Sequence, residues 1–180
     1  MPARRLTRYI RVTIEKGRTM RLHRLAATAL AASAVLGACG GGDEGGSKKA
    51  FIAKGDALCV QNREKQRPIE ERTIGPAFAS GGTPTLSQWR ALFEGIRPIN
   101  AKLFADFKTL EPPTADRARF DRWVALEDDV QAKMDGVLAA AASGDQGRFD
   151  TAMAALNATS EPLEADFRAY GFKVCGAEEP

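Results

Sequence analysis

The sequence predicts an all-α protein: a kinked, up-down four-helix bundle that follows a signal peptide and a flexible tether. Apolar residues recur at spacings of three and four through most of the chain after residue 49, as in amphipathic helices. No strand pattern of any length interrupts them, and mostly short connections favour antiparallel neighbours. We therefore expect a signal peptide at 1–38, a tether at 39–49 and the bundle domain at 50–180.

The first segment has the three parts of a secretory leader. Basic residues at 21–24 precede an apolar run at 25–36, and small residues follow it. The run is too short to span a bilayer, which needs about 20 residues. Met20 begins a complete leader by itself, so we expect it to be the true start; the alternative is that 1–19 belongs to a long basic region.

The leader ends in the motif Leu36-Gly37-Ala38-Cys39. A leucine three residues before the cysteine, a small residue directly before it and three glycines after it resemble bacterial lipoprotein signals. The resemblance implies cleavage between Ala38 and Cys39 and acylation of Cys39, with diacylglycerol and fatty acids such as palmitate. Gly37 departs from the commoner Ala or Ser. The alternatives are an ordinary signal peptide cut near Ala38, or a retained anchor.

The charge of the mature part differs from that of the whole chain. The chain has a net charge of +3, but residues 1–38 hold eight of its 26 basic residues and one of its 23 acidic residues. The remainder has 18 basic and 22 acidic residues, a net charge of −4. Nucleic-acid binding needs a basic patch, and the sequence after residue 38 suggests none, so we expect no nucleic-acid partner.

The only histidine, His23, lies in the leader. A mature chain without it lacks the imidazole that Ser-His-Asp and Cys-His catalysis need. It also lacks ligands for histidine-based zinc sites and for Glu-x-x-His di-iron sites. We therefore expect no enzyme activity, no catalytic residues, no metal site and no cofactor.

Two cysteines remain once Cys39 is assigned to lipid. Exported compartments are oxidising, so we expect Cys59 and Cys175 to form a disulfide. The alternative is two buried free thiols. A redox role is less favoured because no Cys-x-x-Cys motif is present.

The tether and the first helix are distinguished by their apolar content. Residues 40–49 contain no large apolar side chain, whereas a helical pattern begins near Ala50. Pro68 should end or kink this helix, and 69–78 is a second short helical piece. A loop at 79–84 follows.

The next helix starts at a capping box, with Thr85 at the cap and Gln88 three residues later. Pro98 should kink it, and the pair at 112–113 should end it. Its predicted core face consists of Trp89, Leu92, Phe93, Ile96, Ile99, Leu103, Phe107 and Leu110.

Two further helices complete the prediction. The third runs from about Thr114 to Ala142, and 143–145 forms a short turn before the fourth, which Pro162 should bend and Gly171 should end. Residues 172–175 then fold back, so that Cys175 can reach the first helix. The predicted buried faces are Phe120, Trp123, Leu126, Val130, Met134, Val137 and Ala141, and then Phe149, Met153, Leu156, Ser160, Leu163, Phe167 and Tyr170.

Three short motifs carry a resemblance over most of the mature chain. They are Phe51-Ile52-Ala53-Lys54 with Asp56-Ala57 before Cys59, then Leu110-Glu111-Pro112-Pro113, then Tyr170-Gly171-Phe172-Lys173-Val174-Cys175-Gly176. Together they resemble a loose group of small lipoproteins from high-GC Gram-positive bacteria. The resemblance implies a disulfide-closed helical domain and no particular activity.

The aromatic residues allow two interpretations. They are favoured as core, but prolines in three helices could open the bundle around an apolar pocket. The candidate lining residues are Trp89, Phe93, Trp123, Phe149, Phe167 and Tyr170. The acidic run 127–129 is expected to be a solvated helix face. Acid–base chemistry by Glu127 with Glu161, Glu164 and Asp166 is disfavoured because the sequence gives no sign of their burial.

These observations favour a non-enzymatic lipoprotein on the extracytoplasmic face of the cell membrane. Its partners would be the lipid bilayer, through acylated Cys39, and an envelope protein or the wall. The alternative is a lipoprotein that binds a small ligand in an apolar pocket between kinked helices. A carboxylate-based hydrolase comes last.

Overall fold

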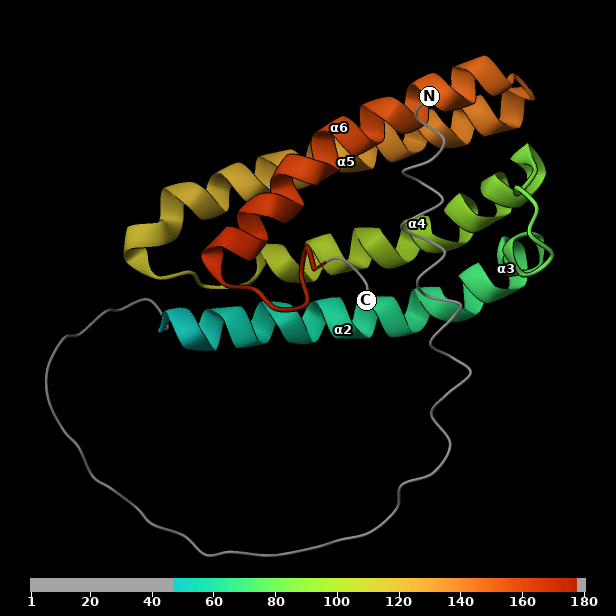
Figure 1. Ribbon diagram of the computed structural model, residues 1–180. Helices are drawn as coiled ribbons and strands as arrows, with labels where there is room; N and C mark the ends of the chain where they lie inside the picture. The colour runs from blue at the N-terminus through green and yellow to red at the C-terminus, as the bar shows by residue number, and fades with distance from the viewer. Residues whose placement is uncertain (1–46, 178–180) are drawn as a thin grey trace, which may run out of the picture. The chain divides into compact units, whose positions relative to one another are not determined.

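The computed structural model describes residues 47–177, all within one compact unit. These residues form an all-α helical bundle and contain no strand, which confirms the predicted fold class (Figure 1). The elements in chain order are α2 (Lys48–Thr73), α3 (Gly75–Ala79), α4 (Leu86–Lys108), the 3₁₀ turn η1 (Thr114–Asp116), α5 (Arg117–Ser143) and α6 (Gln146–Tyr170).

Local capping explains where the helices start and stop. The predicted capping box of α4 is present, with Thr85 and Gln88 each bonded to the other's backbone N–H. The Asp145 carboxylate accepts the Arg148 N–H at 3.0 Å and caps α6. Ser47 accepts the Ala50 N–H, so α2 begins at Lys48, and the expected end of the tether at residue 49 is two residues too late.

The three internal prolines do not end their helices. α2 continues through Pro68 to Thr73, α4 through Pro98 and α6 through Pro162. Each proline removes one backbone N–H, but packing of the surrounding turns keeps the helix continuous. The separate helix expected at 69–78 is therefore wrong, because its first half belongs to α2 and only Gly75–Ala79 forms α3.

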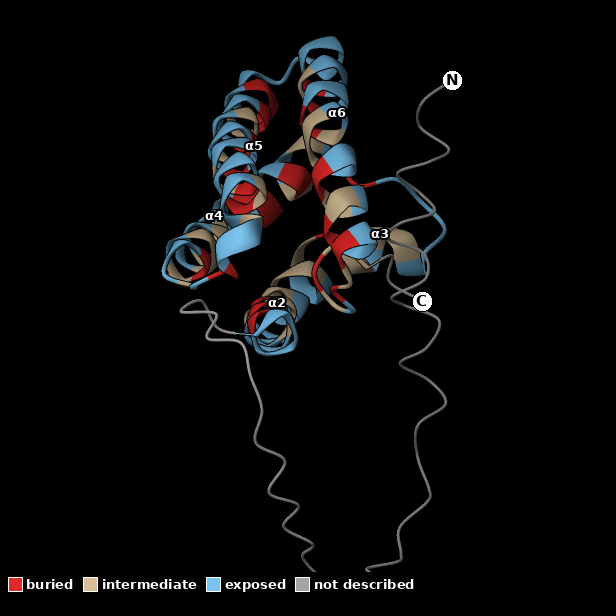
Figure 2. Cartoon of the chain, turned by 90° about the vertical axis from the view of Figure 1, so that its left-hand side faces the viewer, coloured by how far each residue is buried: buried red, intermediate tan, exposed pale blue. Residues whose placement is uncertain are grey.

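Neighbouring long helices pack in chain order, α2 against α4, α4 against α5 and α5 against α6. Within the described residues, α6 and α2 do not close the ring by comparable backbone contact. Figure 2, which looks onto the end where α2 begins, shows the segment after α6 crossing between these two helices. We call residues 171–177 the tail.

The buried helix faces follow the predicted apolar faces, except that Glu127 is buried in place of Leu126. Leu126 was expected in the core of α5 but is 37% exposed, whereas its neighbour Glu127 is only 2% exposed. Trp123, Glu127, Val130 and Met134 keep the four–three spacing of one helix face, and Leu126 lies off it. The helix geometry therefore places a carboxyl group where the sequence predicted a leucine.

Candidate functional site

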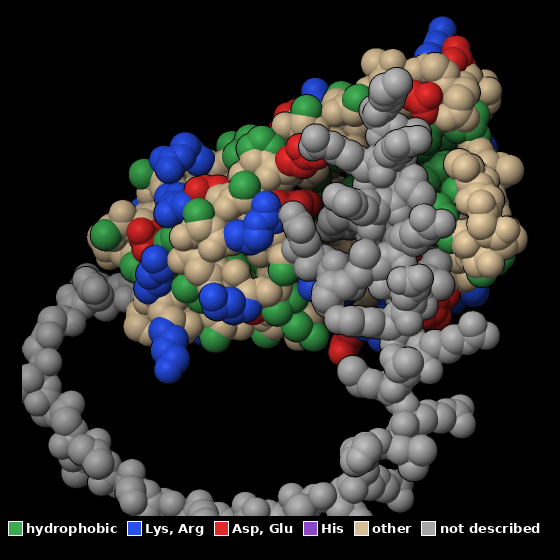
Figure 3. Space-filling model, in the orientation of Figure 1, with side chains coloured by type: hydrophobic (Ala, Val, Ile, Leu, Met, Phe, Trp, Pro, Cys, Tyr) green, Lys and Arg blue, Asp and Glu red, His purple; other side chains and the backbone are tan. Residues whose placement is uncertain are grey.

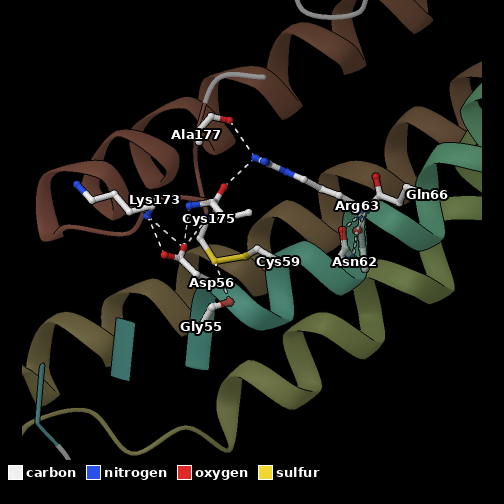
Figure 4. Close-up of a disulfide and its surroundings, with 11 residues drawn as sticks. Gly55, Asp56, Cys59, Asn62, Arg63, Gln66, Lys173, Cys175 and Ala177 are labelled. Atoms are coloured by element: carbon white, nitrogen blue, oxygen red, sulfur yellow. Dashed lines mark hydrogen bonds between the residues drawn. A yellow bond between two sulfur atoms is a disulfide. The ribbon is translucent and has the colours of Figure 1, made fainter. Parts of the chain in front are cut away.

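The tail is joined to α2 by a disulfide between Cys59 and Cys175, whose Cα atoms lie 5.4 Å apart (Figure 4). The two cysteines are 116 residues apart in sequence, so the bond closes most of the unit into one loop. This confirms the predicted pairing and excludes two free thiols in the structure.

Two charged residues on the same face of α2 hold the tail beside the disulfide. The Asp56 carboxylate accepts the backbone N–H groups of Lys173 at 2.9 Å, Val174 at 2.8 Å and Cys175 at 3.0 Å. Arg63 donates to the carbonyl oxygen of Val174 at 2.7 Å and to that of Ala177 at 3.0 Å. We call Asp56, Cys59 and Arg63 the tail clamp (Figure 4).

The roles of Asp56 and Arg63 were not predicted from the sequence. Their spacing was the available signal, because they lie three residues before and four residues after Cys59 and so share its helix face. A carboxylate in this position can accept several tail N–H groups, and a guanidinium can donate to the carbonyls that follow.

Phe172 anchors the tail from inside the bundle. It is 3% exposed and packs against Gly55, where a Cβ atom would lie 2.5 Å from Phe172 Cε1. The sequence analysis treated no residue after Gly171 as core. Gly55, which costs helix propensity, leaves the space that the Phe172 ring occupies.

The six expected pocket residues lie in two separate clusters rather than around one cavity. The tail-end cluster consists of Phe51, Phe107, Phe120, Trp123, Phe167, Tyr170 and Phe172. The turn-end cluster consists of Trp89, Phe93 and Phe149. Phe149 and Phe167 are 18 residues apart on α6, or about 27 Å at 1.5 Å per residue.

The expectation of a single pocket lined by these six side chains is therefore wrong. All six are at most 8% exposed, and each ring packs against at least one other ring. The four–three periodicity correctly predicted that they are buried, but it could not tell how far apart they lie along the bundle.

Polar atoms at the edge of the tail-end cluster are hydrogen-bonded. Trp123 Nε1 donates to Asp166 at 2.6 Å, and the Tyr170 hydroxyl donates to Asp116 at 2.5 Å. The hydrogen bond from Arg119 lowers the pKa of Asp166, while burial and then Asp116 raise that of Tyr170. Their partners therefore favour the charged form of Asp166 and the neutral form of Tyr170, which suits a structural role.

Glu127 is a buried carboxyl group with a strongly shifted pKa. Burial raises its pKa to about 8, against a smaller lowering effect of Lys108 from α4. Its Oε2 atom has no hydrogen-bond partner, and neither has Nε2 of Gln131 one turn later. The expectation of a fully solvated acidic run is therefore wrong for Glu127.

Glu127 is not paired with Glu161 or Asp166. Glu161 is exposed, and Asp166 is bound to Arg119 and Trp123. Across residues 47–177, no three His, Cys, Asp or Glu side chains converge in a way that could hold a metal ion. The geometry offers one isolated, buried acid rather than a site for acid–base chemistry.

A second buried polar group lies between α2 and α4. Asn62, 8% exposed, donates to Asn100 Oδ1 at 3.0 Å, and Gln66 donates to the same oxygen at 2.6 Å. Because its amide groups bond one another between the two helices, this cluster fixes their register.

An open surface groove follows the connection between α5 and α6. Its lining residues are Gly136, Ala139, Ala140, Ser143, Asp145, Gly147, Arg148, Thr151, Ala152 and Ala155. Most have small side chains, and Arg148 and Asp145 pair with each other. The groove therefore has shape but few directed polar groups, and we assign it no ligand.

The remaining predicted site residues, Ala38 and Cys39, lie outside the described residues, as do the leader and the tether up to residue 46. Among the helices that the structure describes, none is both long and apolar enough to cross a membrane. Comparison with known proteins gives no matching family model, no matching curated protein and no matching solved structure.

Proposed function

We propose that this protein is a lipoprotein, anchored by acylated Cys39 at the extracytoplasmic face of a cell membrane, and that its helical unit is a non-enzymatic interaction module. The observation that carries this proposal is the Cys59–Cys175 disulfide. Disulfides persist in oxidising compartments and are rare in the cytosol, so the bond supports export.

The sequence before the unit supports the anchor. The Leu36-Gly37-Ala38-Cys39 motif resembles a bacterial lipoprotein signal, and α2 starts only nine residues after Cys39. An acyl chain on Cys39, strengthened by a second, would hold such a domain at the bilayer surface without a membrane-spanning helix.

The chemistry of the unit favours binding over catalysis. Three carboxylates near the tail have structural contacts: Asp56 holds the tail, Asp116 accepts a hydroxyl and Asp166 forms an ion pair. Of the acids weighed as partners for the buried Glu127, Glu161 is exposed and Asp166 is paired with Arg119. We do not carry the ligand-pocket alternative forward, because its six aromatic residues lie in two clusters and pack on one another.

Acylation of Cys39 is the direct test. The full chain is expressed in a bacterium with lipoprotein-processing enzymes and labelled with a palmitate analogue. We expect a labelled mature chain that begins at Cys39, identified by mass spectrometry, in the membrane fraction. Cys39→Ser should lose the label and the cleavage.

Gly37→Ala is the matched control, because it changes the motif towards its commoner form and should leave labelling intact. Two results would overturn the proposal: an unlabelled wild-type chain in a host that labels its own lipoproteins, or equal labelling of the Cys39→Ser variant.

A further inference from the structure

Basic side chains gather at the end of the unit where α2 begins, although the chain after residue 38 has a net charge of −4 (Figure 3). We call this surface the basic end. It is formed by Lys48, Lys49, Lys54, Arg117, Arg122, Arg168 and Lys173.

Contacts around Tyr170 bring these residues together from different elements. Lys48 Nζ lies 4.1 Å from the centre of the Tyr170 ring, and the Arg119 guanidinium, next to Arg117 on α5, lies 5.1 Å from it. Lys173 is fixed beside the first turns of α2 because its backbone N–H is bound by Asp56. The start of α2, the start of α5 and the tail therefore share one surface.

The carboxylates at the basic end are largely engaged elsewhere. Asp56 holds the tail N–H groups, Asp116 accepts the Tyr170 hydroxyl, and Asp166 pairs with Arg119. Glu111 and Asp121 are exposed carboxylates nearby in sequence, and within residues 47–177 neither forms an ion pair.

Several cations of the basic end have no acidic partner. Within residues 47–177, Lys49, Lys54, Arg117 and Lys173 form no ion pair. Arg168 donates instead to the backbone carbonyl oxygen of Gly176. The surface thus keeps a positive excess that the unit itself does not neutralise.

Basic residues occupy the first turns of two helices, where positive charge is unfavourable. Helix N-termini carry partial positive charge, so lysine and arginine are disfavoured in the first turn. Lys48 and Lys49 open α2, Arg117 and Arg119 open α5, and neither first turn contains an acidic residue. The positive ends of both helices add to the side-chain charges, and an external anion would relieve the repulsion.

The position of the basic end relative to Cys39 identifies that anion. Ser47 follows Cys39 by eight residues, and eight residues span at most about 29 Å when fully extended. A lipid on Cys39 would therefore keep the start of α2 within that distance of the bilayer. The anionic groups that a bilayer itself can present at its surface are phospholipid headgroups.

We propose that the basic end docks on the anionic headgroups of the same membrane that holds Cys39. This inference rests on the proposed acylation of Cys39, which would supply a high local concentration of the surface. Each lysine or arginine near an anionic membrane contributes about fivefold to partitioning, so a cluster of them orients the unit with α2 starting at the bilayer.

The test uses a chain that cannot be acylated, so that it measures vesicle binding by the basic end alone. The chain from residue 39 onwards, carrying Cys39→Ser, is mixed with vesicles of phosphatidylcholine or of equal parts phosphatidylcholine and phosphatidylglycerol, and sedimented. It keeps the carboxylates at Asp43, Glu44, Glu178 and Glu179, so their repulsion is included. We expect binding only to the anionic vesicles, weakened as salt is added.

A matched pair of variants locates the effect. Lys49→Gln, Lys54→Gln and Lys173→Gln together should lower partitioning on the order of 100-fold. The control carries Lys65→Gln, Arg67→Gln and Arg72→Gln, which remove the same charge from exposed positions further along α2. It should bind nearly as well as the parent, and circular dichroism confirms that both variants are folded.

Three outcomes would overturn the inference: no binding to anionic vesicles, equal losses in the two variants, or binding to soluble polyphosphate without binding to vesicles. The last result would point to an anionic polymer instead. The labelling experiment is independent of these readouts. If the wild-type chain is acylated in the labelling experiment but the Cys39→Ser chain does not bind vesicles, only this inference is overturned. If the wild-type chain is not acylated but the Cys39→Ser chain binds vesicles, the anchor is overturned and the basic end remains a surface that binds headgroups.

Discussion

The tail end of the unit is closed by a disulfide, the Asp56 and Arg63 contacts and seven packed rings, whereas the turn end has three rings and a groove of small residues. In the described part of the chain, the one disulfide lies at the tail end and none crosses the turn end. The two ends are built from the same four helices but hold them together by different means.

The difference follows from the path of the chain. α2 and α6 meet through Phe51 and Tyr170 but make few backbone contacts, and the tail lies between them up to Ala177, which Arg63 binds. Beyond that point the helices depend on ordinary side-chain packing. The strongest constraints therefore lie at the tail end of the unit.

Removal of the disulfide should give the largest loss of stability. For a closed loop of this length, the chain-entropy model predicts that Cys59→Ala with Cys175→Ala lowers the free energy of unfolding by about 4–5 kcal/mol. Urea denaturation of the oxidised parent and the double variant measures the difference. A loss below about 1 kcal/mol would show that the tail clamp and Phe172 hold the tail without the bond.

Truncation of one ring at each end compares their packing directly. Phe172→Ala should cost about 3–5 kcal/mol, the usual range for a buried phenylalanine. Phe172 meets five other rings, whereas Phe149 meets only Trp89, so Phe149→Ala should cost less by about 1 kcal/mol or more. Unfolding of the two variants in urea gives the ranking, and a larger loss for Phe149→Ala would contradict the comparison.

Glu127, between the two aromatic clusters on α5, should make stability depend on pH. Its pKa is about 8 in the folded unit against a usual 4.5, so between these values the folded state holds a proton that the unfolded chain releases. The contribution of Glu127 to the free energy of unfolding should therefore fall as pH rises from about 4.5 to about 8, by about 1.4 kcal/mol per pH unit. Outside that window this contribution should stay constant.

Glu127→Gln should remove this component of the slope and stabilise the unit at pH 7 by about 3–3.5 kcal/mol, with little effect below pH 4.5. Urea denaturation at intervals from pH 4 to about 8 measures both chains. Asp121→Asn is the control, because Asp121 is exposed on the same helix and is not among the groups that shift the pKa of Glu127, so this variant should keep the parent slope. Identical slopes in the parent and Glu127→Gln would remove Glu127 as the cause.

Local signals in the sequence predicted much of the fold. The Thr85–Gln88 capping box, the turn at Gly144 and the helix end at Gly171 depend on a few adjacent residues, and all three are present in the structure. The disulfide was also predictable. Assigning Cys39 to lipid leaves only Cys59 and Cys175, and the expected oxidising compartment favours a bond between them.

Features that depend on three-dimensional placement were not predictable. Leu126 and Glu127 differ by one helix position, and only the packed bundle shows which of them faces the core. The six aromatic residues share a periodicity although they lie at two ends, and periodicity carries no information on distance along the bundle. Asp56 bonds a tail more than 110 residues away, a contact that no local pattern contains.

The smallest effect should come from filling space at the turn end. Gly136 lies within α5, and a Cβ atom there would meet nothing within 4 Å. Gly136→Ala should therefore stabilise the unit by about 0.5–1 kcal/mol through the lower conformational entropy of the unfolded chain. Gly55→Ala, the same change at the tail end, should destabilise it, because the new Cβ would collide with Phe172. Urea denaturation of both variants gives the two signs, and equal signs would mean that the two ends accommodate added volume alike.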